Sequence, residues 1–180
     1  MKLDGKPKAI IAFDPEGMIF ATASAPYVRL YNLKQLGSGP FAEFNLEDSI
    51  RNISAHKAQG RFNPQFVGLK FDAKGKHLLV TTNQGLVLVV ESFHGALESV
   101  IGDFELARAH NTEAAYSADS NYVLKGASDG TVRCWSRSTA NLVRTWDSVH
   151  TGPVRCLKFN PLMANFASTC VNLNLWLPRL

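Results

Sequence analysis

The chain has 180 residues, of which 46% are apolar and 19% are charged, which is enough for one domain with a sizeable core. No apolar run reaches the roughly 18 residues of a membrane-spanning helix, and no apolar stretch follows the basic N-terminus as in a secretory signal. We therefore expect no membrane partner. The net charge of +4 is uneven, because residues 120–180 carry 7 basic and only 2 acidic side chains. This basic third either faces an acidic partner or is simply solvated.

One plan recurs four times along the chain. A short apolar strand ends on an aromatic residue, a turn follows, and further short strands complete the unit. The aromatic residues that end the first strands are Phe13, Phe71, Tyr116 and Phe159, at spacings of 58, 45 and 43 residues. A second anchor follows 17 to 19 residues after each of them, at Tyr31, Val90, Trp135 and Trp176.

The remaining strands are expected in chain order. They are Met18–Ser24, Tyr27–Leu33 and Phe41–Asn45 in the first unit, His77–Thr82, Leu86–Ser92 and Leu97–Ile101 in the second, Tyr122–Ala127, Thr131–Ser136 and Leu142–Trp146 in the third, and Asn165–Thr169 and Asn172–Leu177 in the fourth. Four short antiparallel strands in about 43 residues are typical of a propeller blade.

We therefore predict an all-β fold of about four consecutive β-propeller blades filling residues 1–180. The blades are expected at about residues 7–49, 65–107, 111–150 and 151–180. Blades bury their apolar faces against their neighbours. We expect largely buried side chains at the repeated aromatic positions, namely Phe13, Phe71, Tyr116, Trp135, Phe159 and Trp176.

Two stretches, "SDGTVRCW" at residues 128–135 and "HTGPVRCLKFNP" at residues 150–161, resemble the WD-repeat family. The family's unit carries a His, a hairpin Asp and a strand Trp that hydrogen-bond together. The resemblance gives Asp129, His150 and Trp176 these structural roles. The first two units have Tyr31 and Val90 at the Trp position, so we expect them to depend more on apolar packing.

The stretches "FDPEGMIFA", "GPFAEF" and "GLKFDAKGK" and residues 150–178 resemble one WD-repeat subfamily. It is the subunit shared by COMPASS-type histone methyltransferase complexes and by complexes that end RNA polymerase II transcription. The resemblance implies a non-catalytic nuclear scaffold and a seven-bladed ring, of which this chain supplies the C-terminal part. It implies as partners the subunits of a methyltransferase, termination, phosphatase or 3′-end processing assembly, and the phosphorylated polymerase tail. A fragment, an incomplete gene model and a natural short form all remain open.

An insertion at residues 46–65 explains why the first spacing exceeds the others by 13 to 15 residues. Its segment 49–64 contains no acid but carries Arg51, Lys57 and Arg61. A long loop on a rigid scaffold often carries a binding site, and arginines suit phosphate or an acidic peptide. The other interpretation is a tolerated, mobile insertion. Outside the insertion, the candidate contacts for such a partner are Arg133 and Arg155.

Catalytic motifs are missing from the sequence. It contains no GxSxG, HExxH or Walker motif, and its histidines show no ligand spacing. Gly37–Ala42 imitates GxGxxA, but Pro40 removes a backbone donor and a strand follows. We therefore expect no enzyme activity, cofactor, metal or sequence-specific nucleic acid binding. The alternative is a generic adaptor, such as a ubiquitin-ligase substrate receptor. Trp135-Ser-Arg137 and Trp176-Leu-Pro178 depart from the Trp-Asp-x-Arg of that class.

Overall fold

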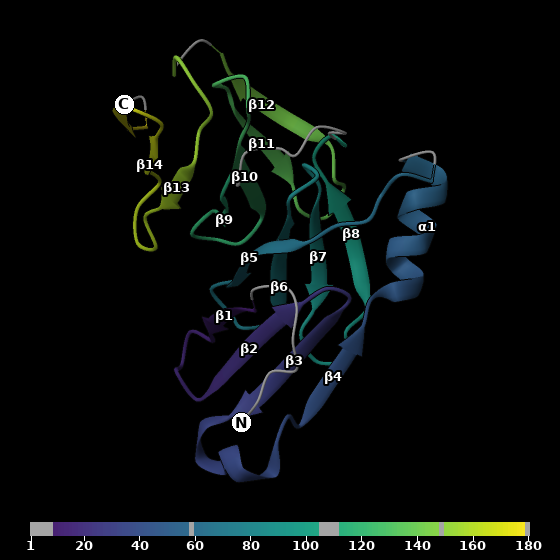
Figure 1. Ribbon diagram of the computed structural model, residues 1–180. Helices are drawn as coiled ribbons and strands as arrows, with labels where there is room; N and C mark the ends of the chain where they lie inside the picture. Colours follow the sequence, from purple (N-terminus) through teal and green to yellow (C-terminus); the bar gives the residue numbers. More distant parts are fainter. Residues whose placement is uncertain (1–8, 58–59, 105–111, 148–149, 179–180) are drawn as a thin grey trace.

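The computed structural model describes residues 9–57, 60–104, 112–147 and 150–178. Its strands form four antiparallel sheets that follow one another in chain order, which confirms the prediction of an all-β fold of consecutive blades (Figure 1). Blade 1 holds β1 (Ile10–Phe13), β2 (Ile19–Ser24), β3 (Tyr27–Asn32) and β4 (Ala42–Asn45), and blade 2 holds β5 (Phe66–Phe71), β6 (His77–Thr82), β7 (Val87–Glu91) and β8 (Leu97–Ile101). Blade 3 holds β9 (Ala114–Tyr116), β10 (Tyr122–Gly126), β11 (Val132–Ser136) and β12 (Leu142–Trp146), and blade 4 holds β13 (Cys156–Phe159), β14 (Phe166–Thr169) and β15 (Leu173–Trp176).

The first turn of blades 1 and 2 is built by an Asp and a Gly. Asp14 Oδ1 accepts a hydrogen bond from the Ile19 backbone amide at 2.8 Å, and Asp72 Oδ1 accepts one from the Lys76 amide at 2.7 Å. Gly75 follows Asp72 with a φ of +68°, a conformation that costs other residues free energy. The sequence "D-x-x-G" therefore fixes where the first strand ends and the second begins.

The repeated anchors lie in rows across the blades. In blade 4, Phe159 pairs with Phe166, and Phe166 pairs with Trp176. The ring centroids of Phe166 and Trp176 lie 5.3 Å apart in a stacked arrangement. Tyr116, Val123 and Trp135 form the same row in blade 3. The spacing of 17 to 19 residues in the sequence is thus the path from the first strand to the third.

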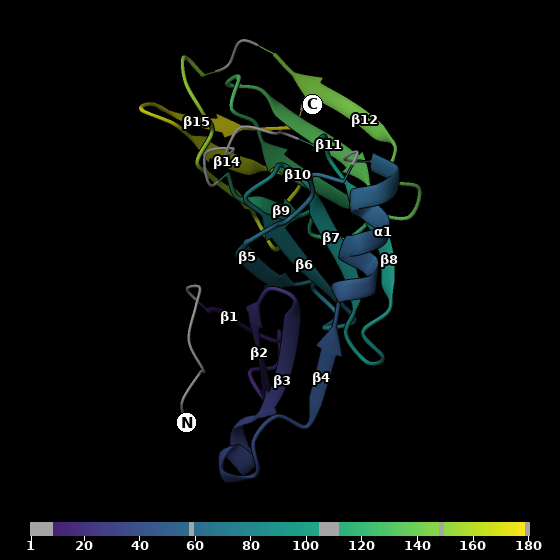
Figure 2. The ribbon, with the colours of Figure 1, turned by 45° about the vertical axis from the view of Figure 1, so that its right-hand side comes forward.

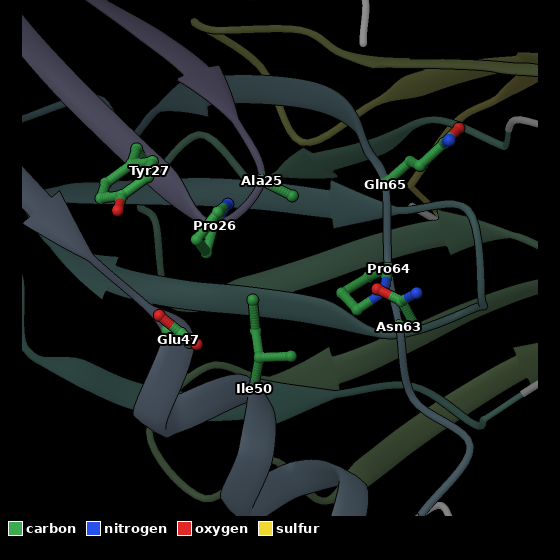
Figure 3. Close-up of a pocket in the computed structure, with 8 residues that line it drawn as sticks. All are labelled: Ala25, Pro26, Tyr27, Glu47, Ile50, Asn63, Pro64 and Gln65. Carbon is green, nitrogen blue, oxygen red and sulfur yellow. The ribbon is translucent and has the colours of Figure 1, made fainter. Parts of the chain in front are cut away.

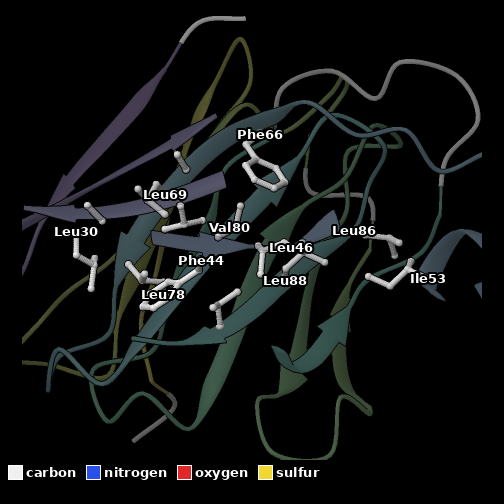
Figure 4. Close-up of a cluster of buried hydrophobic side chains, with 14 of the residues drawn as sticks. Leu30, Phe44, Leu46, Ile53, Phe66, Leu69, Leu78, Val80, Leu86 and Leu88 are labelled. Atoms are coloured by element: carbon white, nitrogen blue, oxygen red, sulfur yellow. The ribbon is translucent and has the colours of Figure 1, made fainter. Parts of the chain in front are cut away.

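Alternating residues of blade 2 pack against opposite neighbours. Leu78 and Leu88 belong to an apolar cluster with blade 1, whereas Leu79 and Val89 belong to a cluster with blade 3. Successive side chains of a strand point to opposite faces, so a blade covered on both faces reads as a continuous apolar run. Figure 4 shows the first cluster, which extends from the sheet of blade 1 across blade 2 and includes Ile53 of the helix that connects the two blades.

The expected burial of the aromatic anchors is only partly met. Tyr116 and Trp135 are 8% and 6% exposed, but Phe13 is 57% exposed, so the prediction for Phe13 is wrong. The reason follows from the row position. Tyr116 packs against Leu79 and Val89 of the preceding blade, whereas no described blade precedes Phe13. The other three anchors, Phe71, Phe159 and Trp176, are half-buried.

Two helices interrupt the sheets. The 3₁₀ helix η1 (Leu33–Ser38) follows β3, and helix α1 (Glu47–Lys57) connects blade 1 to blade 2. Figure 2 shows α1 beside the outer strand β8, the same neighbour as in Figure 1. Within the described ranges, neither helix has the length and apolar character to cross a bilayer.

Candidate interaction surfaces

The topology brings the predicted contact residues to one end of the blades. In an antiparallel blade, the hairpin between the second and third strands lies at the same end as the start of the first strand and the finish of the fourth. We call this the insertion end, because α1 follows β4 there. Arg155 precedes β13, Arg133 is the second residue of the third strand of blade 3, and Arg51 and Arg61 lie in the insertion. The sequence prediction therefore selected residues at one end of the fan of blades.

The insertion is a packed helix rather than an open basic loop. Ile53 is 6% exposed and contributes to the cluster between blades 1 and 2. After the helix, the Asn63 amide donates to Gln84 Oε1 and the Gln65 amide donates to Asn83 Oδ1, both at 2.9 Å. These hydrogen bonds tie the insertion to the second hairpin of blade 2.

The sequence contained a signal for this helix. Asn45 caps it, because Asn45 Oδ1 accepts a hydrogen bond from the Glu47 amide at 2.9 Å. Glu47 and Asp48 occupy the first turn, where negative charge is favoured. The apolar residues Leu46, Ile50 and Ile53 are spaced four and three residues apart, as on one face of a helix. The search for repeats did not reveal the helix, because the helix does not recur in other units.

The basic side chains of the insertion differ in how free they are. Arg51 forms ion pairs with Glu47 at 3.3 Å and with Asp48 at 3.4 Å on the exposed surface of α1. Arg61 is exposed, and no ion pair involves its side chain among the described contacts. Lys57 is the last residue of α1, and its side chain lies outside the described residues. Arg61 therefore remains the clearest candidate for an acidic ligand in the insertion.

Arg133 and Arg155 show the same contrast. Arg133 is bound by Asp129 at 2.6 Å and by Asp103 at 3.1 Å, and its side chain is only 26% exposed. Arg155 is exposed just before β13, and no described ion pair includes it. Arg133 is therefore held by acidic side chains of this chain, whereas the side chain of Arg155 is exposed for contact with a ligand. It does not assemble the predicted residues into a continuous basic surface, because acids are interspersed with them.

The WD-type structural residues are partly connected. In blade 4, Ser168 Oγ accepts a hydrogen bond from Trp176 Nε1 at 2.9 Å and lies 2.8 Å from His150 Nε2. His150 is 5% exposed and Trp176 is half-buried, so Ser168 connects a buried ring to a partly buried one. Asp129 instead accepts hydrogen bonds from the amide and hydroxyl of Thr131 at 2.9 and 2.6 Å. In this chain, Asp129 shapes its own hairpin.

A charged group joins three blades on their inner strands. Glu113, just before β9, lies 3.7 Å from Lys70 Nζ of β5 and 3.2 Å from Lys158 Nζ of β13. Burial lowers the pKa of Lys70, and the Glu113 carboxylate opposes this effect. Burial alone would raise the pKa of Glu113, but Lys70 and Lys158 hold the pKa below its usual range. Within the described part of the chain, no cluster of His, Cys, Asp and Glu fits a metal ion.

An exposed apolar surface lies at the opposite end of blades 1 and 2. A cleft of about 380 Å³ is lined there by Phe41 and Phe93, which are 57% and 79% exposed. The exposed side chains of Met18, Leu33 and Leu36 belong to connections at the same end of blade 1. We call Phe41 and Phe93, which line the cleft, the apolar end patch. Exposed apolar surfaces of this kind mark protein contacts.

Sequence reasoning did not find the apolar end patch. Its residues lie in turns that differ from blade to blade, so no repeat position pointed to them. The available signal was the placement of large apolar residues in connections where polar residues are usual, such as Phe93 between β7 and β8.

Comparisons with known proteins agree with the repeat. A family described as WD domain, G-beta repeat, matches residues 108–136. WD repeat-containing protein 82 of Drosophila melanogaster is 35% identical over 179 residues, covering 99% of this chain and 52% of that protein. COMPASS component SWD2 of Saccharomyces cerevisiae is 28% identical over 88% of this chain and 48% of its own length. Protein ANTHESIS POMOTING FACTOR 1 of Arabidopsis thaliana is 29% identical over 99% of this chain and 49% of its own length. The chain therefore spans about half the length of these relatives.

Proposed function

We propose that this chain, a WD-repeat protein built of propeller blades, acts as part of a non-catalytic interaction scaffold in a nuclear Set1/COMPASS-type complex. The observation that carries the proposal is the similarity to a COMPASS component over 88% of the chain. A Set1 complex component of Schizosaccharomyces pombe is also similar, at 25% identity over 78% of the chain. The four blades would form part of a seven-bladed ring in the complete assembly.

The apolar end patch supports a scaffold function. Phe93 is 79% exposed on a turn, where it supports no blade packing. Phe41 lines the same cleft from the position just before β4, the outer strand of blade 1. Aromatic residues that fill or line pockets contribute strongly to protein–protein binding. We therefore expect a subunit of the complex to cover this patch.

Co-precipitation tests this proposal. The tagged protein is expected to recover a Set1-type methyltransferase subunit from nuclear extract. Phe93→Glu is expected to reduce this recovery at least about tenfold, because a charge would be buried in an apolar contact. Val171→Glu is the matched control, since Val171 is 92% exposed in the last hairpin of blade 4, at the insertion end.

Absence of every methyltransferase subunit from the precipitate would contradict the scaffold assignment. Equal recovery with Phe93→Glu and the control would contradict only the assignment of the apolar end patch.

A finer proposal concerns the phosphorylated polymerase tail and termination or 3′-end processing assemblies. It rests on Arg61 and Arg155, exposed basic residues at the insertion end. Arginine forms charge-assisted hydrogen bonds with phosphate, and such contacts weaken with salt when they are exposed.

Binding of phosphorylated and unphosphorylated tail peptides over a range of salt tests this finer proposal. Arg61→Glu with Arg155→Glu is expected to abolish preference for the phosphorylated peptide. The matched pair is Arg51→Glu with Arg133→Glu, whose arginines already have acidic partners. Binding that ignores phosphate, salt and both pairs would remove the direct contact.

A further inference from the structure

A second cleft lies at the insertion end, on the side of blade 1 next to blade 2. It has a volume of about 540 Å³ and is bounded by the β2–β3 hairpin, the first turns of α1 and residues 63–65. Figure 3 shows Ile50 extending from α1 toward Pro26, while Glu47 and Tyr27 occupy one side. The apolar part of the lining is formed by Ala25, Pro26, Ile50 and Pro64.

The walls of this cleft are fixed before any ligand arrives. The Leu46 amide donates to the Pro26 carbonyl oxygen at 3.0 Å, which joins the start of α1 to the hairpin. The Asn63 amide is held by Gln84 at 2.9 Å, and Pro64 is buried. A cleft whose walls are already ordered loses less conformational entropy on binding.

The polar groups of the cleft suit a cation. Among the described lining residues the one charged side chain is that of Glu47, which is 57% exposed, and Asn63 and Tyr27 add oxygen acceptors. Asp48, the next residue, is 90% exposed and adds negative charge beside the cleft. No lysine or arginine belongs to its described lining.

Arg51 is the competing cation. It lies 3.3 Å from Glu47 and 3.4 Å from Asp48, and its side chain is 70% exposed. Exposed ion pairs of this type contribute little to stability and exchange readily. An incoming cation could therefore take Glu47 while Arg51 keeps Asp48.

We propose that this cleft binds a lysine or arginine side chain of a partner peptide. The methylene stem would lie against Pro26, Ile50 and Pro64, and the charged head would reach the Glu47 carboxylate. Long basic side chains combine an apolar stem with a charged tip in this way. The proposal rests on the cleft alone and does not depend on membership of a Set1-type complex.

Short peptides that differ at one central residue test the proposal, with binding followed by NMR titration. The central residue is lysine, arginine, acetyl-lysine, norleucine or glutamate. The lysine and arginine peptides are expected to bind about five- to tenfold more tightly than the acetyl-lysine and norleucine peptides, with the Ile50 methyl signals shifting. Equal binding of all the peptides, preference for glutamate, or no binding of the basic peptides would overturn the proposal.

Two variants locate the head group. Glu47→Gln is expected to weaken the lysine peptide about fivefold, whereas Asp48→Asn is expected to change it less than twofold. Both variants remove one acid from the first turn of α1, so their effects on the helix are matched. An effect of Asp48→Asn as large as that of Glu47→Gln would show general electrostatic attraction and overturn the assigned contact.

Discussion

Blade 2 and blade 4 place chemically different side chains at the same buried position of their second strands. Val80 in β6 and Ser168 in β14 occupy the same row of their blades, two residues after Leu78 and Phe166, and both are completely buried. Blade 2 uses the position for apolar packing against blade 1. Blade 4 uses it for a hydroxyl that connects His150 to Trp176.

The difference follows from what covers each blade. Blade 2 contributes to apolar clusters with blades 1 and 3, and Val87, Leu88, Val89 and Val90 are completely buried. Blade 4 contributes to one cluster, with blade 3, and Leu173 and Leu175 are 70% and 65% exposed. Apolar burial is proportional to covered area, so a blade with one covered face gains less from it. The polar connection then carries a larger share of the stability of blade 4.

Val80→Ser is expected to give the largest effect, about 3 kcal/mol of lost unfolding free energy. It removes buried methyl groups and places a hydroxyl among the apolar side chains of the cluster between blades 1 and 2. Urea unfolding measures the change. Val80→Ala is the control, because it removes volume without adding a hydroxyl. If serine were tolerated as well as alanine, blade 2 would not be the apolar blade that its packing indicates.

Ser168→Val is expected to cost about 2 kcal/mol in the same measurement, because it leaves His150 Nε2 and Trp176 Nε1 without their shared partner. Ser168→Thr keeps the hydroxyl and has nearly the volume of valine, so it separates hydrogen bonding from size. Equal stability of the valine and threonine variants would mean that packing alone holds blade 4.

The repeat made most of the fold predictable from the sequence. The aromatic ends and turn residues of each unit determine where strands begin and end, and the strand order follows from short connections. Phe13 shows the limit of this reasoning. Its place in the pattern equals that of Tyr116, but burial depends on the neighbouring blade, which a pattern within one unit does not describe.

The candidate surfaces were less predictable. Composition identified Arg51 and Arg133 as available charges, but acids from the preceding helical turn and from another connection reach them in space. The apolar end patch and the cleft beside α1 are each formed by connections that do not repeat. Their residues meet only after the blades have stacked, so periodicity gave no indication of them.

Glu113→Gln is expected to give the smallest effect, and it tests the link between the two blades. Glu113 contacts Lys70 of blade 2 and Lys158 of blade 4, and its pKa lies below the usual range. A carboxyl whose folded pKa is depressed contributes stability above its unfolded pKa and loses it as the pH falls through the folded value. Since Glu113 is 38% exposed, solvent screening limits this contribution to about 0.5–1 kcal/mol.

The expected result is therefore a difference between wild type and Glu113→Gln that is present at neutral pH and shrinks progressively as the pH falls below the ordinary glutamate pKa of about 4.3. Urea unfolding at several pH values measures it. Asp48→Asn is the control, because Asp48 is 90% exposed and contacts no other blade among the described ion pairs. A difference that persists unchanged at low pH would mean that Glu113 acts by packing and not through its charge. In that case, the ion pairs of Glu113 with Lys70 and Lys158 would contribute no stability of their own.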